Sequence, residues 1–243
     1  MKLYYDMHIH SCLSPCGDDD MTPSDIAGIG ALNNLSVMAL TDHNSCKNCP
    51  AFFEACEFYG IIPIAGMELT TAEDIHIVCL FKNLSSAMSF SNYVYDRIFP
   101  VKNKPEIFGN QNVVDTDGNI LENVEKLLIS ATDIPIEEVP KLVAEYDGIC
   151  YPAHIDRDAN GIIAILGDIP PEPGFICAEM HDKDKLEMYK ENYQSISYLK
   201  FVFSSDAHRI SDINSDINFL EIDDKYENSI VEGIFNKLSN KKM

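Results

Sequence analysis

The chain has 243 residues, 46% of them hydrophobic, which is enough to form one large domain with a sizeable core. Its 18 basic and 39 acidic residues give a formal net charge of −21, which argues against tight non-specific binding to duplex nucleic acid. No apolar run reaches the roughly 18–20 residues of a membrane span, and the first residues lack the apolar core of a signal peptide. We therefore expect a cytoplasmic protein that makes no membrane contact, and its oligomeric state is open.

Strand-like and helix-like segments alternate along the chain. Residues 2–10 are typical of a first strand, and Thr22 with Pro23 supplies the N-cap and first position of a helix that runs to about residue 33. Further strands are expected at residues 37–40, 61–67, 75–81, 149–153, 175–180, 201–204 and 217–222. Further helices are expected at residues 51–59, 85–98, 121–130, 136–146, 184–194 and 226–238.

This order predicts an α/β fold in which parallel strands are connected by helical crossovers. We expect residues 1–243 to form a single domain. The stretch at residues 102–119, or about 101–120, is typical of an inserted loop or lid rather than of a separate domain.

Histidines and acids are associated with most of the predicted strands, usually at the C-terminal end. In β/α barrels the active site lies at this end of the strands, so separate motifs are expected to converge on one rim. The residues concerned are His8, His10, Asp42, His43, Glu68, His154, Asp206 and His208.

Imidazoles and carboxylates are the ligands of Zn²⁺, Mn²⁺ and Fe²⁺ at hydrolytic sites. His8 and His10 are two residues apart, which places both rings on one face of a strand. Asp206 and His208 repeat this spacing. Glu68 follows an apolar strand, and its two carboxylate oxygens can bridge two metals. The pattern indicates one site for several metal ions.

Two more histidines are weaker candidates. His76 lies in an otherwise apolar strand, so only the surrounding motifs favour a ligand role for it. His181 shares a strand face with Glu179. We expect His181 not to be a ligand, and a supporting or substrate-binding role is open for this pair.

Taken in order, these motifs resemble those of the polymerase and histidinol phosphatase (PHP) superfamily. They read Asp6-Met7-His8-Ile9-His10-Ser11, Leu40-Thr41-Asp42-His43-Asn44, Gly66-Met67-Glu68, Pro152-Ala153-His154 and Ser205-Asp206-Ala207-His208. The resemblance implies a distorted (β/α)7 barrel with two or three divalent metals at the C-terminal ends of the strands. It assigns His8, His10, Glu68 and Asp206 to one metal, and Glu68, His76 and His154 to a second.

The third metal implied by the resemblance would take His43, His208 and a ligand from the loop after His10, where this chain departs from the family pattern. Counting back from Thr22-Pro23 favours Asp18 as that ligand, and we expect Asp18. Counting forward from His10 favours Cys16, a softer ligand that would bias the site toward zinc or iron.

The chemistry expected of such a site is phosphoester hydrolysis, in which a metal-bound hydroxide attacks phosphorus. The substrate is expected to be a small phosphorylated metabolite or nucleotide, and histidinol phosphate is one possibility by resemblance. We expect Glu68, Asp206, His208 and Arg157 to carry the reaction. Arg157, Arg209 and Asn44 adjoin predicted ligands and are expected to bind substrate, since guanidinium groups grip phosphate. No polymerase or helicase segment is recognisable, so the chain is interpreted as a stand-alone phosphoesterase.

Two alternatives are open. The first is a metal-dependent amidohydrolase acting on C–N bonds, although no lysine lies at a predicted strand end to serve as its bridging ligand. The second is a non-catalytic metal-binding regulatory domain, against which the full ligand set argues.

Four cysteines, Cys12, Cys16, Cys46 and Cys49, lie in the loops after the first two strands. They could form a zinc site or a redox pair, but unpaired thiols are expected.

Overall fold

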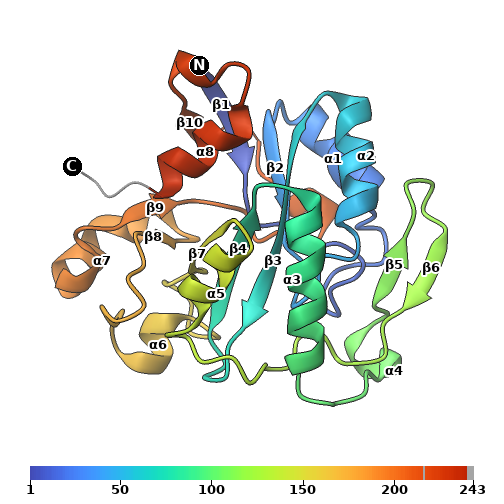
Figure 1. Ribbon diagram of the computed structural model, residues 1–243, viewed down its shortest axis with the longest axis horizontal. Coiled ribbons are helices and arrows are strands. Elements are labelled where there is room, and N and C mark those ends of the chain that lie inside the picture. Colours follow the sequence, from blue (N-terminus) through green and yellow to red (C-terminus); the bar gives the residue numbers. More distant parts are fainter. Residues whose placement is uncertain (216, 240–243) are drawn as a thin grey trace.

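The computed structural model describes residues 1–215 and 217–239, and its largest sheet has six strands in the order β10-β1-β2-β3-β4-β7 (Figure 1). Strands β5 and β6 form a hairpin, and β8 pairs with β9. The strands are β1 (Lys2–Asp6), β2 (Val37–Leu40), β3 (Ile62–Thr70), β4 (His76–Phe81), β5 (Asn112–Val114), β6 (Ile120–Asn123), β7 (Gly148–Pro152), β8 (Cys177–Glu179), β9 (Lys200–Val202) and β10 (Phe219–Glu221).

Helices α1, α2 and α3 stand along one side of the large sheet (Figure 1). The α-helices are α1 (Pro23–Leu32), α2 (Cys49–Tyr59), α3 (Leu84–Arg97), α4 (Pro105–Phe108), α5 (Val139–Glu145), α6 (Ile162–Leu166), α7 (Leu186–Asn192) and α8 (Ile230–Ser239). The predicted start of α1 is confirmed, because the Thr22 side chain accepts a hydrogen bond from the Asp25 N–H and Pro23 is the first helical residue. None of the helices in residues 1–215 and 217–239 is long and apolar enough to cross a membrane.

Strands β1, β2 and β3 are parallel, as predicted, but β4 is antiparallel to both β3 and β7. The expectation that the strands are parallel is therefore wrong for β4. Only residues 71–75 separate the two strands, and a parallel connection needs about a dozen residues. The reversal brings the first residue of β4, His76, opposite Thr70, the last residue of β3.

The sheet curls into a half-barrel and does not form one continuous seven-stranded ladder. Beyond β7, the Ile155 N–H donates to the Glu179 carbonyl, which brings β8 alongside. After β9, an isolated parallel bridge joins Ala207 to Ile9, beyond the end of β1. The predicted α/β class is confirmed, whereas a regular (β/α)7 barrel is not.

Both faces of the central strands are buried, as parallel sheets require. On β2, Val37 and Ala39 face an inner cluster that includes Phe235 of α8, while Met38 and Leu40 pack among the helices outside. Helix α8 thus contributes to the core enclosed by the curled sheet.

The first strand is shorter than the predicted span of residues 2–10, since β1 ends at Asp6. Beyond Asp6, two backbone N–H groups bond to side chains instead of to a neighbouring strand. The Met7 N–H donates to Ser204 Oγ at 3.3 Å, and the Ile9 N–H donates to Thr41 Oγ1 at 3.1 Å. His8 and His10 consequently lie on an irregular extension of the strand.

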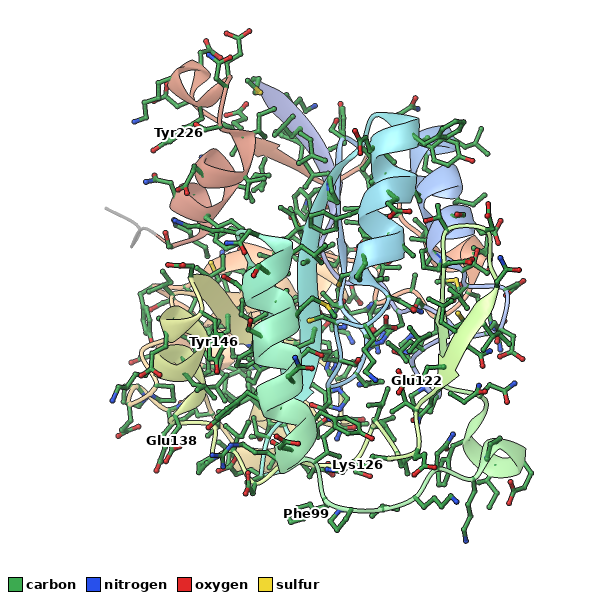
Figure 2. All side chains as sticks on the ribbon, turned by 45° about the vertical axis from the view of Figure 1, so that its right-hand side comes forward. Phe99, Glu122, Lys126, Glu138, Tyr146 and Tyr226 are labelled. Atoms are coloured by element: carbon green, nitrogen blue, oxygen red, sulfur yellow. The ribbon has the colours of Figure 1, made fainter. Side chains whose placement is uncertain are left out.

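A long excursion connects α3 to α5 and contains α4 and the β5–β6 hairpin, at the right of Figure 1. Two antiparallel bridges, Ile98 to Thr132 and Lys102 to Lys126, close its base, near which Figure 2 labels Phe99 and Lys126. The predicted helix at residues 121–130 is wrong, because residues 120–123 pair with β5 instead. The Asp115 carboxylate accepts the Asp117 and Asn119 N–H groups and so builds the turn between the two strands.

Candidate metal centre

Eight of the nine predicted ligand residues, all except Asp18, come from six separate segments and gather at one end of the curled sheet. His8 and His10 follow β1, His43 follows β2, and Glu68 lies near the end of β3. His76 opens β4, and its reversed direction brings it to the same edge. His154 follows β7, and Asp206 with His208 follows β9. All of them are buried except His208, which is partly exposed.

Glu68 occupies the centre of this cluster. Its Oε1 lies 2.9 Å from His76 Nδ1, 3.0 Å from His154 Nε2 and 3.4 Å from His8 Nε2. Its Oε2 lies 3.1 Å from His43 Nδ1 and 3.4 Å from His10 Nε2. Burial would raise the pKa of Glu68, but the surrounding histidines, His76 foremost, lower it well below its usual value. The carboxylate is therefore charged.

Asp206 faces Glu68 across the two histidines that follow β1. Its Oδ1 lies 3.1 Å from His10 Nε2 and 3.3 Å from His8 Nε2. Burial opposes ionisation of Asp206, yet the charge of His8 and the contact with His10 hold its pKa below the usual range. The φ angles of Asp206 (+52°) and His154 (+26°) are positive, a conformation that is strained for residues other than glycine and that concentrates at functional sites.

Three sets of ligand atoms lie within 4.8 Å of one another and could each hold a metal ion. They are His8, His10, Glu68 and Asp206; His43, Glu68 and His76; and His10, His43 and His208. The sets share His10, His43 and Glu68, so they form one continuous centre. His154 contacts Glu68 but is in none of the three sets, although it was expected to bind the second metal.

A further observation indicates that these residues suit divalent metal ions. His43 Nδ1 and Asp206 Oδ1 are buried and make no hydrogen bond, although each lies about 3.1 Å from another ligand atom. Buried polar atoms without partners cost free energy, and a shared cation would satisfy both. The donor set of imidazoles and carboxylates suits Zn²⁺, Mn²⁺ or Fe²⁺.

Buried acids hold the histidine rings in place. His8 Nδ1 lies 2.8 Å from Glu179 Oε1, and the same oxygen accepts the His154 N–H. His10 Nδ1 lies 2.9 Å from Ser14 Oγ, whose hydroxyl donates to Asp42 at 2.7 Å. Such contacts fix the orientation of metal-binding imidazoles. Sequence reasoning gave Asp42 no such role and considered Glu179 only with His181, because the partners are remote in sequence.

The protonation states of the histidines differ across the cluster. Burial would lower the pKa of His10, but Asp206 and Glu68 outweigh it and raise the pKa to about 9. Burial, followed by the charge of His10, lowers the pKa of His208 to about 4. Burial also holds the pKa of His43 well below its usual value. His43 and His208 are therefore neutral at pH 7, the form in which imidazole binds metals.

The expected substrate-binding residues lie in different places. Arg157 contacts the Asp206 carboxylate and lies 3.3 Å from His181 Nδ1. Arg209 lies at the surface, with its Nε 3.6 Å from Asp18 Oδ2. Asn44 is buried, and its amide bonds the Leu128 and Ser130 carbonyls and the Thr70 N–H, so its polar atoms hold backbone segments together.

Asp18 and Cys16, the two candidates for the loop ligand, point in different directions. The Asp18 side chain is 53% exposed and pairs with Arg209, whereas Cys16 Sγ lies 3.2 Å from His43 Nε2. The other three cysteines that were considered as ligands, Cys12, Cys46 and Cys49, belong to none of the three metal-capable sets. Cys46 and Cys49 direct their sulfur atoms toward the Gly66 carbonyl, and Cys12 directs its sulfur toward the Asn112 carbonyl.

A cavity of about 660 Å³ opens beside the cluster. Asp206 and His208 line it on the metal side, and Arg157, His181 and Lys183 line it as well. It adjoins the metal ligands and carries basic side chains, so an anion bound there would be close to a bound metal.

The structure also resembles solved structures. A lesion-specific endonuclease, PfuEndoQ from Pyrococcus furiosus, superposes with a TM-score of 0.63 at 19% identity and covers 100% of this chain, which spans 57% of the endonuclease. An endonuclease Q complex with a 27-mer duplex substrate gives 0.63 at 17% identity, with 100% and 58% covered. A metal-dependent phosphoesterase from Bifidobacterium adolescentis, described as putative, gives 0.60 at 16% identity, with 97% and 96% covered.

These similarities establish the fold. Because an endonuclease structure with bound duplex is among them, they lend no support to our expectation that the chain does not bind duplexes.

No curated protein matches the chain. The PHP domain family matches residues 6–208, a span that contains every residue of the metal cluster. The match, together with the cluster, supports a metal-dependent hydrolase, and the chain belongs to the PHP domain family.

Proposed function

We propose that the protein hydrolyses phosphoesters of a small phosphorylated metabolite or nucleotide with two or three bound divalent metals, Zn²⁺, Mn²⁺ or Fe²⁺. The observation that carries the proposal is the position of Glu68, whose two oxygens each lie within 3.4 Å of histidines from different strands. A carboxylate so placed can bridge metal ions. Bound metals would acidify water and offset charge on a phosphoryl group.

The residues around the metals have separate tasks in this proposal. Glu68 and Asp206, with His8 and His10, hold the ions close together. His208 serves as a ligand rather than as a proton donor, because a pKa of about 4 leaves it neutral at pH 7. Glu179 and the Ser14–Asp42 pair keep the rings of His8 and His10 aimed at the ions.

Arg157 is the residue that we expect to hold the phosphate. It lines the cavity next to Asp206, and its side chain is 37% exposed, so the guanidinium can reach an anion in the cavity. Lys183 lines the same cavity and adds positive charge, and His181 lines it as well. The pairing of Arg209 with Asp18 at the surface and the saturated amide of Asn44 favour neither as a substrate-binding residue.

The cavity volume of about 660 Å³ supports a substrate of the size of a metabolite or nucleotide. The fold is shared with an endonuclease that acts on duplex DNA, so phosphodiesters belong in the test beside monoesters. Cleavage of C–N bonds is less favoured, because the Glu68 carboxylate, and not a lysine, occupies the central bridging position between the histidines.

The test combines elemental analysis of the purified protein with a hydrolysis screen of phosphomonoesters, phosphodiesters and short duplexes, with and without added Mn²⁺. Two or three metals per chain and metal-dependent phosphate release would support the proposal, and the preferred ester would separate phosphatase from phosphodiesterase. Bound metal without cleavage of any phosphoester would overturn it in favour of an amidohydrolase or a regulatory domain.

Arg157→Ala sharpens the test. We expect a higher KM or a lower kcat/KM with unchanged metal content, since the guanidinium is not a ligand. Lys190→Ala, on α7 and outside the lining of the cavity, is the matched control and should leave both values unchanged. Loss of metal in Arg157→Ala would show that the arginine instead holds Asp206 in place.

A further inference from the structure

One corner of the metal cluster lacks an acidic ligand. It consists of His10, His43 and His208 together with the loop of residues 14–18, and we refer to it as the loop corner. The ring centroids of His10 and His208 are 4.2 Å apart, and those of His10 and His43 are 4.6 Å apart. The other two metal-capable sets each contain Glu68, whereas this set contains imidazoles alone. An ion here would be held by neutral ligands unless the loop supplies an anion.

The thiol of Cys16 is the loop group that faces this corner. Its Sγ lies 3.2 Å from Nε2 of His43, the ring nitrogen that does not face Glu68. His43 is only 2% exposed, so the contact is made at a buried ring. Cys16 also lines a cavity of about 500 Å³ between this loop and α4, which gives an ion a route to the thiol.

The loop is held in this conformation from both sides of Cys16. The Gly17 N–H donates to the Ser14 carbonyl, and the Asp18 N–H donates to the His208 carbonyl, both at 3.0 Å. The second bond ties the loop directly to one histidine of the corner. Gly17 also needs to be glycine, because a Cβ there would lie 2.5 Å from the Ser11 carbonyl oxygen.

The same geometry turns Asp18 away from the corner. Its carboxylate is half exposed and lies 3.6 Å from Arg209 Nε, so it pairs with a cation at the surface. Hydrogen bonds fix the backbone at Asp18 through its N–H and also through its carbonyl, which accepts the Met21 N–H. The Asp18 carboxylate thus has its partner at the surface, whereas Cys16 Sγ already lies 3.2 Å from His43 Nε2.

We propose that Cys16, and not Asp18, is the fourth ligand of a metal ion held by His10, His43 and His208. On binding, the thiol releases its proton to solvent and a metal–sulfur bond forms. A set of three imidazoles and one thiolate is soft, so this position selects zinc, or iron, over manganese and magnesium. The proposal rests on the metal centre proposed above, but it concerns which atoms bind the ion and not which bond is hydrolysed.

The experiment uses the whole chain, stripped of metal with a chelator and titrated with Co²⁺. A thiolate ligand gives a sulfur-to-cobalt charge-transfer band in the near ultraviolet, which histidine and carboxylate ligands do not give. We expect the wild type to show this band and Cys16→Ser to lose it together with one bound ion per chain. Asp18→Asn should retain the band and all ions.

Cys150→Ser is the matched control, because Cys150 lies on β7 at the far side of β4 from Glu68 and should leave the band unchanged. A second measurement needs no variant. X-ray absorption of the zinc-loaded wild type should reveal sulfur at about 2.3 Å from zinc. The proposal is overturned if the wild type has no charge-transfer band, if the band persists in Cys16→Ser, or if Asp18→Asn rather than Cys16→Ser loses an ion. None of these readings depends on phosphate release, so they remain separate from the test of hydrolysis.

Discussion

The two sides of the metal cluster are built differently. On the side of Glu68, the ligands extend from strands, and the buried carboxylate of Glu179 behind them holds the ring of His8. At the loop corner, His208 is partly exposed, its Nδ1 contacts the Asp206 carbonyl, and the remaining candidate ligand lies on a loop. A carboxylate-supported site on strands is rigid, whereas a ligand on a loop depends on the conformation of that loop. We therefore expect the two sides of the cluster to bind metal ions with unequal affinity.

The largest expected effect comes from Glu68→Gln, which removes the charge shared by two metal-capable sets. We expect kcat to fall by about a thousandfold or more, roughly 4 kcal/mol of transition-state stabilisation, and metal content to fall by at least one ion. Elemental analysis and hydrolysis assays measure both. Glu122→Gln, on the exposed hairpin, is the control. A Glu68→Gln protein with full metal content and rate would contradict the central role of this residue.

The second effect concerns pH. In the metal-free protein His10 has a pKa of about 9, so it is protonated at pH 7 and a metal must displace that proton. Apparent affinity should therefore rise with pH by about tenfold per unit for each proton released, and the contribution of His10 should level off near pH 9. His208, with a pKa of about 4, should release none. Calorimetry in two buffers of different ionisation enthalpy counts the protons. Affinity that is flat between pH 6 and 8 would count against the charged state of His10.

Glu179→Gln should weaken metal binding by about 10- to 100-fold, because the ring of His8 loses the carboxylate that orients it. The loss of affinity should affect the metal ions on the Glu68 side and not the ion at the loop corner. The charge-transfer band of the cobalt protein should therefore be unchanged. Competition with a metal-binding dye measures the affinities. Glu187→Gln, exposed on α7, serves as the comparison. Equal weakening of every ion would show that the two sides are not independent.

The smallest effect is expected from Gly17→Ala, which shifts the loop because the added Cβ meets the Ser11 carbonyl oxygen. We expect only the ion at the loop corner to weaken, by a few-fold to about tenfold, with a stability cost of about 1–3 kcal/mol. Gly118→Ala, in the turn of the hairpin with φ of +81°, should cost comparable stability without changing metal binding. A matching loss of metal in both variants would mean that global destabilisation is responsible.

The side of Glu68 could be predicted from the sequence to a large extent. The spacing of His8 and His10, the acid near the end of β3 and the pair Asp206 and His208 named residues that the fold does bring together. The motifs sufficed because parallel strands end at a common edge, so residues at strand ends meet without knowledge of the loops. His76 joined them for a reason that was not foreseen, since β4 runs in the opposite direction.

The α/β class, the family and most residues of the metal-capable cluster could be read from the sequence. The antiparallel direction of β4, the hairpin pairing of residues 120–123, the contact of Glu179 with His8 and the position of Cys16 rather than Asp18 beside His43 could not. The physical reason is that strand periodicity and capping are local properties, whereas each of these outcomes depends on backbone hydrogen bonds or side-chain contacts between segments far apart in the chain. Around Cys16, the deciding contacts are those that the loop of residues 14–18 makes with Ser11 and His208.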